Sequence, residues 1–108
     1  MPARSPEEIC RLFKQYMAAS DIESLRTIYD PQVTFLNQSR KEKKGWQELK
    51  AELAPLAAAK TIFEYDIRQI VQSDDIALMH TRWKVQSLQP MSQYAIEVAR
   101  WQSGGTWR

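Results

Sequence analysis

The hydrophobic pattern of this chain changes its period once, near Thr61, and this change limits the folds that are possible. Before Thr61, apolar residues recur every three or four positions, as they do on the buried face of an amphipathic helix. After it, apolar and polar residues alternate from Phe63 to Arg68, as in a strand with one buried face. Helices followed by a run of strands predict an α+β domain, with the helices on one side of an antiparallel sheet.

Two helices are expected before Pro31. The first begins at residues 5–8, Ser-Pro-Glu-Glu, which form a capping box with proline in the first turn, and its apolar stripe runs from Ile9 to Met17. The second begins at a similar box, Ser20 to Glu23. It ends before Pro31, because the residue that precedes a proline avoids helical backbone angles.

The middle of the chain predicts a short strand and a third helix. Val33 to Asn37 is rich in β-branched and aromatic residues, and a polar, basic stretch follows at residues 38–44. We interpret this stretch as a solvated loop, since no aromatic residue lies between its charges as nucleic-acid binding would require. The third helix starts near Gly45, and Pro55 is expected to end or kink it.

An antiparallel meander is expected after Thr61. A turn at residues 73–75 separates its first strand from a second one, Ile76 to Leu88, and Gln93 to Gln102 forms a third. Glycines at the following turn predict a hairpin to a short fourth strand, residues 106–108.

Composition excludes several functional classes. The 108 residues suit one domain, 1–108, and a net charge of +2 is too small to indicate nucleic acid or an anionic membrane as the main partner. A single cysteine cannot form an internal disulfide, and the sequence has no apolar run that resembles a signal peptide or a membrane span. We therefore expect a cytoplasmic protein. One histidine and one cysteine are too few for a usual zinc site, and we expect neither a metal nor another cofactor.

Three local motifs resemble the nuclear transport factor 2-like superfamily, and in particular its SnoaL-like bacterial members. The first is residues 18–31, which begin with Ala-Ala-Ser-Asp-Ile-Glu-Ser-Leu and end with Tyr-Asp-Pro. The second is residues 73–83, which run from Ser-Asp-Asp to Arg-Trp. The third is residues 97–108, which run from Glu-Val-Ala-Arg to Gly-Thr-Trp-Arg. The resemblance implies a cystatin-like, cone-shaped α+β barrel with N-terminal helices packed on a curved antiparallel sheet. It also implies a small-molecule ligand and a homodimer formed through the sheet.

Ketosteroid isomerase is a distant relative within this superfamily, and its catalytic tyrosine, aspartate base and protonated acid can be placed on this chain. The tyrosine falls on Phe13, which has no hydroxyl, although Tyr16 lies one turn further on. The base falls on Asn37, an amide that cannot accept a proton at neutral pH. The acid falls on Glu97. Only Glu97 is ionisable, so the isomerase mechanism is not expected here.

The position of the loop near Gln89 suggests a strand register in which Arg82 faces Glu97 and His80 faces Ala99. Their shared face is then either a polar pocket wall or a solvated outer face with one weak ion pair. A bulge that switches faces within a strand can reconcile the two. His80 has no nucleophile motif near it, and a hydrogen-bonded structural histidine is the alternative to a catalytic one. The candidate pocket residues are Phe13, Tyr16, Asn37, His80, Arg82, Glu97 and Trp101.

We therefore expect a small-molecule-binding domain without the isomerase mechanism. The alternative is a cofactor-independent isomerase, dehydratase or cyclase that uses Glu97 as an acid or a base.

Overall fold

The computed structural model describes residues 3–36, 40–86, 91–102 and 104–108. Its elements, in chain order, are α1 (Pro6–Ala18), α2 (Ile22–Leu25), the 3-10 helix η1 (Arg26–Ile28), β1 (Thr34–Leu36), β2 (Glu42–Lys44), α3 (Trp46–Ala58), β3 (Ile62–Ser73), β4 (Ile76–Gln86) and β5 (Met91–Arg100). Among these residues, none of the helices has the length and the hydropathy needed to span a lipid bilayer.

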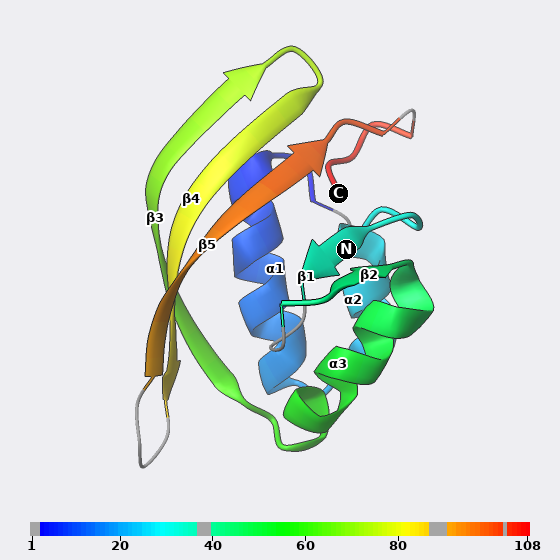
Figure 1. Cartoon of the computed structure of the whole chain (residues 1–108), viewed down its shortest axis with the longest axis vertical. Helices are drawn as coiled ribbons and strands as arrows, with labels where there is room; N and C mark the ends of the chain where they lie inside the picture. The colour runs from blue at the N-terminus through cyan, green and yellow to red at the C-terminus, as the bar shows by residue number, and fades with distance from the viewer. Residues whose placement is uncertain (1–2, 37–39, 87–90, 103) are drawn as a thin grey trace.

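The long strands form one curved antiparallel sheet in the order β3-β4-β5, and α1 lies along its concave side (Figure 1). β1 and β2 form a separate two-stranded hairpin next to α3. This arrangement is the expected α+β architecture. The buried side chains of α1, α2, η1 and β4 form the core, and its largest fully buried members include Met17, Leu25, Ile28 and Met79.

A bulge in β3 helps to bend the sheet. Ile67 pairs with Thr81 and Gln69 pairs with His80, so Arg68 has no partner in the register. An extra residue of this kind bends its strand and increases the local twist. The curved sheet therefore wraps around α1 instead of lying flat against it.

The helix starts differ from the expected capping boxes. α1 has proline in its first turn, but the Ser5 side chain makes no capping hydrogen bond. The cap of α2 is Asp21, whose carboxylate accepts hydrogen bonds from the Ser24 backbone at 3.2 Å and from its hydroxyl at 2.7 Å. Ser20 has a φ of 57° and lies in the turn between the helices. Its left-handed backbone turns the chain before α2 begins.

In the middle of the chain, the loop predicted for the basic stretch is wrong, and of the two outcomes expected for Pro55 the end of the helix does not occur. The basic stretch contains β2, which pairs antiparallel with β1, because backbone hydrogen bonds hold it while its side chains remain largely in solvent. Pro55 lies inside α3 and does not end it. The turn after Pro55 buries Ala57, and this packing offsets the backbone hydrogen bond that proline cannot donate. Asn37, the expected end of the first strand, lies outside the described residues.

The last residues of the chain form isolated bridges in place of the expected fourth strand. Arg100 and Arg108 exchange two backbone hydrogen bonds, of 2.9 and 3.1 Å. Trp107 bridges both Ala3 and Trp101, and its side chain is buried, as expected for an anchor.

Candidate functional site

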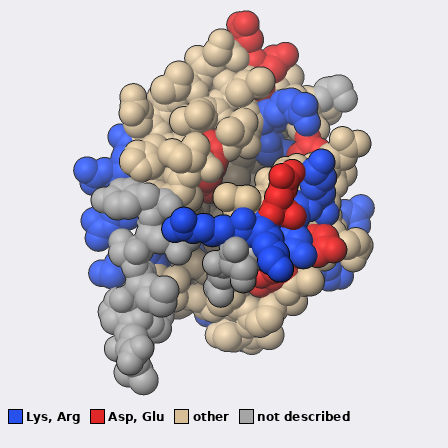
Figure 2. All heavy atoms as spheres, viewed as in Figure 1, with Lys and Arg blue, Asp and Glu red and all other residues tan. Residues whose placement is uncertain are grey.

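A cavity of about 790 Å³ lies between α1, the β1 segment and the inner side of β4 and β5. Figure 2 shows this face of the molecule hollowed between uncharged residues, with charged side chains beside the opening. Most of the lining is apolar. Its ionisable members are Cys10, Tyr29, Asp30, Glu97, Arg100 and Arg108.

The apolar wall contains a cluster of three aromatic rings from α1, β3 and β4. The Phe13 ring lies 5.1 Å from Phe63 and 5.2 Å from Trp83, between ring centroids, and both contacts are edge-to-face. Phe63 and Trp83 contact each other in the same manner. Edge-to-face contacts of this kind are favourable in addition to the burial of the rings. The cluster therefore gives the cavity a preformed apolar surface.

Glu97 is the acidic group on the sheet side of the cavity. It lies within β5 opposite Met79, and its side chain is partly buried. Burial raises the pKa of Glu97 above its ordinary value, because the charged form loses hydration, and the polar groups of the nearby Thr81 and Trp83 side chains oppose this rise. Glu97 is therefore the carboxyl group in this cavity that is best suited to hold a proton.

Cys10 and Thr81 lie beside Glu97. The Cys10 thiol points to the Glu97 carboxylate, with Sγ at 4.0 Å from Oε1. Burial, and then the nearby Glu97 charge, raises the pKa of Cys10 to about 12. Thr81 Oγ1 is buried, and no group among the described residues makes a hydrogen bond of good geometry with it. Its hydroxyl dipole nevertheless lowers the pKa of Cys10 and of Glu97.

Tyr29 brings a second hydroxyl to the cavity, from the end of η1. Its ring stacks on Trp46 of α3, with centroids 6.0 Å apart. Burial, followed by the Glu97 charge, raises the pKa of Tyr29. At neutral pH the phenol and the Cys10 thiol are thus both neutral hydrogen-bond donors. In the described part of the chain, no group of three His, Cys, Asp or Glu side chains is arranged to hold a metal ion.

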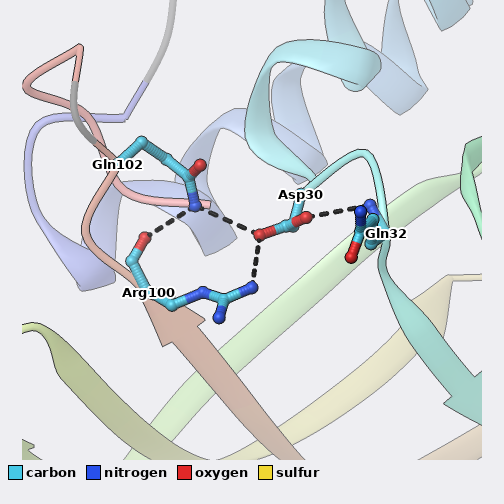
Figure 3. Close-up of polar contacts among 4 residues, drawn as sticks. All are labelled: Asp30, Gln32, Arg100 and Gln102. Atoms are coloured by element: carbon cyan, nitrogen blue, oxygen red, sulfur yellow. Dashed lines mark hydrogen bonds and ion pairs between the residues drawn. The ribbon is translucent and has the colours of Figure 1, made fainter.

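A polar network at the edge of the cavity joins residues seventy positions apart (Figure 3). Asp30 accepts hydrogen bonds from the Gln32 backbone at 2.8 Å, the Arg100 guanidinium at 2.9 Å and the Gln102 amide at 3.3 Å. The bond from Gln32 and then that from Arg100 lower the pKa of Asp30. The network holds the β1 segment against the end of β5.

The expected pairing of β4 with β5 is wrong by three residues. Glu97 pairs with Met79, and His80 pairs with Ile96. Because the displacement is an odd number, His80 and Arg82 lie on the opposite face of the sheet from Glu97. Arg82 is therefore not the cation opposite Glu97. The inner face instead carries Met79 and Thr81, which the helices cover.

The other predicted pocket residues are distributed over several sites. Phe13 lines the cavity, as Glu97 does. Tyr16 is buried in the core and is not among the described lining residues. Trp101 is 41% exposed and packs edge-on against Trp107, also outside the lining. Asn37 lies outside the described residues.

Sequence reasoning missed Cys10, Tyr29 and the two arginines at the edge of the cavity. Cys10 belongs to the buried core and, three residues before Phe13, also lies on the helix face that lines the cavity. Tyr29 follows η1 directly, and no pattern in the sequence connects it with Glu97.

The sequence matches no family model and no curated protein. Its structure is similar to a protein from Thiobacillus denitrificans described as a calcium/calmodulin-dependent protein kinase type II association domain, with a TM-score of 0.82 and 13% identity over 100% of this chain and 91% of that chain. A protein from Streptomyces avermitilis, described as a dehydratase of the nuclear transport factor 2-like family, is also similar. Its TM-score is 0.72, and its sequence identity is 17% over 94% of this chain and 86% of that chain.

A ketosteroid isomerase-like protein from Erwinia carotovora atroseptica is also similar, with a TM-score of 0.68 and 19% identity over 94% of this chain and 85% of that chain. These three structures share the arrangement of helices on a curved antiparallel sheet seen in Figure 1, at sequence identities that carry information on fold alone. The chain therefore has the nuclear transport factor 2-like fold.

Proposed function

We propose that this chain is a small-molecule-binding domain and that its ligand occupies the cavity between α1, β1 and β5. The observation that supports this most directly is the cavity itself, about 790 Å³ with a mainly apolar lining. Ligand sites typically have volumes of about 300–1,000 Å³, apolar walls and a few polar groups that fix orientation. Glu97, Tyr29 and Cys10 provide such groups, next to the apolar surface of the aromatic cluster.

The proposal does not include the isomerase mechanism. Phe13, at the position of the isomerase tyrosine, belongs to the aromatic cluster and offers no hydroxyl. Asn37, at the position of the base, cannot accept a proton at neutral pH. Glu97 is the position of the three that keeps an ionisable group, and a single carboxyl group cannot serve as both the base and the oxyanion-hole acid.

The alternative is a cofactor-independent isomerase, dehydratase or cyclase with Glu97 as its acid or base. The raised pKa of Glu97 supports this alternative, since a carboxyl group with a raised pKa is protonated, and so able to donate its proton, up to a higher pH than an ordinary one. The descriptions of two structural neighbours, as isomerase-like and as a dehydratase, agree with such chemistry.

Binding of 2-naphthol, monitored through backbone amide chemical shifts, tests the proposal. This neutral aromatic alcohol matches the aromatic wall and offers one hydroxyl to Glu97. We expect shift changes concentrated at cavity residues such as Phe13, Trp83 and Ala99, and weaker binding to Glu97→Gln than to the matched exposed variant Glu48→Gln. Shift changes confined to the outer face of the sheet, or none at all, would contradict the proposal.

We also propose that the chain forms a homodimer through the outer face of the sheet. Val71, Leu78 and Ile96 are all at least 40% exposed and lie outside the cavity lining, and the register places them together on this face. Such a patch is typical of an interface, and a second copy can cover it with the same surface around a two-fold axis. Sedimentation at micromolar concentration should detect a dimer, and Ile96→Lys should dissociate it. A wild-type monomer under these conditions would rule this interface out.

A cytoplasmic location completes the proposal. The single cysteine is free and buried in the structure, as is usual for a thiol in a reducing compartment. Fractionation of cells that produce the full chain would test the location.

A further inference from the structure

We propose that the ligand of this cavity is an apolar carboxylic acid whose carboxylate binds between Arg100 and Arg108. The inference rests on the proposed function, since it assumes that a ligand occupies the cavity, and it adds the charge, the orientation and the chemical class of that ligand.

The backbone brings the two arginines together. Arg100 N–H donates to Arg108 O at 2.9 Å, and Arg108 N–H donates to Arg100 O at 3.1 Å. Residues that exchange both backbone bonds are directly opposite each other, and their side chains lie on the same side of the strand pair. Both arginines line the cavity. Two guanidinium groups therefore flank one edge of a mainly apolar space.

The two arginines differ in their partners at this edge. Asp30 forms an ion pair with Arg100 at 2.9 Å, and its lowered pKa keeps it ionised at neutral pH. Arg108 has no ion pair among the described residues, and its Nε is buried without a hydrogen-bond partner there. Like charges opposite each other in a strand pair are unfavourable, and a buried donor without a partner costs free energy. A bound anion would remove both penalties.

The donor geometry of arginine favours a carboxylate. A planar carboxylate matches the planar donor set of a guanidinium group and can accept two hydrogen bonds from it. A phosphate monoester carries close to two negative charges at neutral pH, so Asp30 repels it more strongly than it repels a carboxylate. The donor geometry and the Asp30 charge therefore favour a carboxylic acid over a phosphate ester.

The interior of the cavity defines the rest of the ligand. Phe13, Phe63 and Trp83 form the apolar wall, which suits an aliphatic or aromatic body. Glu97 does not repel an acid strongly, because burial favours its neutral form. A ligand with its carboxylate at the arginines therefore directs its apolar body toward the aromatic cluster.

A pair of probes that differ only in charge tests this inference. We would measure the dissociation constants of 2-naphthoate and methyl 2-naphthoate by calorimetry with the full chain. The acid should bind at least about tenfold more tightly than the ester, the range expected for a hydrogen-bonded charge pair. Arg108→Gln should remove that preference, measured as the ratio of the dissociation constants of the ester and the acid, and Arg108→Lys should restore part of it. Arg26→Gln, an exposed arginine outside the cavity lining, is the matched control.

The outcomes separate this inference from the proposed function. If the acid and the ester bind the wild-type chain equally, the carboxylate site is wrong while ligand binding in the cavity stands. An acid preference that persists in Arg108→Gln overturns the role of Arg108. If neither probe binds, the proposed function fails, and this inference fails with it. Thermal unfolding of each variant verifies that it is folded.

Discussion

Cys10 Sγ lies 4.0 Å from Glu97 Oε1, so the first helix and the last strand meet through a thiol and a carboxyl group. The two residues are 87 positions apart in the chain. Their contact lies at the wall of the cavity and joins the two elements between which the cavity opens. The carboxyl group consequently depends on the packing of α1 as well as on its own strand.

The thiol of Cys10 should be unreactive in the folded protein. Its pKa of about 12 leaves almost no thiolate at pH 8, and the side chain is buried. A thiolate is the reactive form, so a disulfide reagent such as 5,5′-dithiobis(2-nitrobenzoate) should label the native chain only as it unfolds. The same reagent in 6 M guanidinium chloride should label one thiol per chain at once. Complete labelling of the native protein within seconds would contradict the burial of Cys10.

Glu97→Gln should change how stability depends on pH. The folded pKa of Glu97 is raised, so its contribution to stability is fully present below about pH 4.5 and is lost as the pH rises through the folded value. The free energy of unfolding of Glu97→Gln relative to wild type should therefore increase from pH 4 to pH 8. Urea unfolding at several pH values measures this, with Glu48→Gln as the control. A constant difference across this range would show that burial does not perturb Glu97.

Asp30→Asn should weaken the link between the β1 segment and β5. The substitution removes the charge that pairs with Arg100 at 2.9 Å, and we expect a loss of about 1.5 kcal/mol at pH 7. The pKa of Asp30 is lowered, so its contribution is present above about pH 3.8 and disappears as the pH falls through the folded value. The two proteins should become equally stable in acid. Urea unfolding at pH 7 and near pH 2 tests both parts, and an unchanged loss in acid would argue against the ion pair.

Trp107→Ala should lower the free energy of unfolding by about 3 kcal/mol, as large-to-small changes of buried aromatic residues do. Trp107 is 5% exposed and bridges Ala3 and Trp101, so its loss opens a cavity where the two ends of the chain meet. Trp101→Ala, at a residue that is 41% exposed, should cost less. Thermal and urea unfolding of both variants compare the two. Equal losses in the free energy of unfolding for the two variants would show that the burial of Trp107 does not anchor the end of the chain.

The positions of the main elements could be predicted from hydrophobic periods because each has one buried face. Phe63 and Tyr65, for example, alternate with polar residues and do point toward the core side of β3. β2 could not be predicted in this way. Its Glu-Lys-Lys sequence has no apolar face, and backbone pairing with β1 is what forms the strand.

The register of β4 and β5 could not be derived from the pattern, because both faces of β5 carry apolar residues. Ile96 and Val98 resemble core residues in the sequence and are about 65% exposed in the structure. Turn geometry selects the register of a hairpin, and a displacement by an odd number of residues exchanges the two faces. The inward position of Glu97 followed from the resemblance alone, while its contacts with Cys10 and Tyr29 depend on tertiary packing.

The bulge at Arg68 has a consequence for how this chain can change over evolution. Arg68 lies outside the lining of the cavity, but the extra residue bends the sheet around α1 and sets which side chains of the following segment face inward. Deleting this single residue would leave Ile70 opposite Met79 on the inner face, but it would remove the bend and flatten the wall. The length of β3 thus governs the shape of the cavity, and an insertion or deletion there would remodel the binding space more than many substitutions within it.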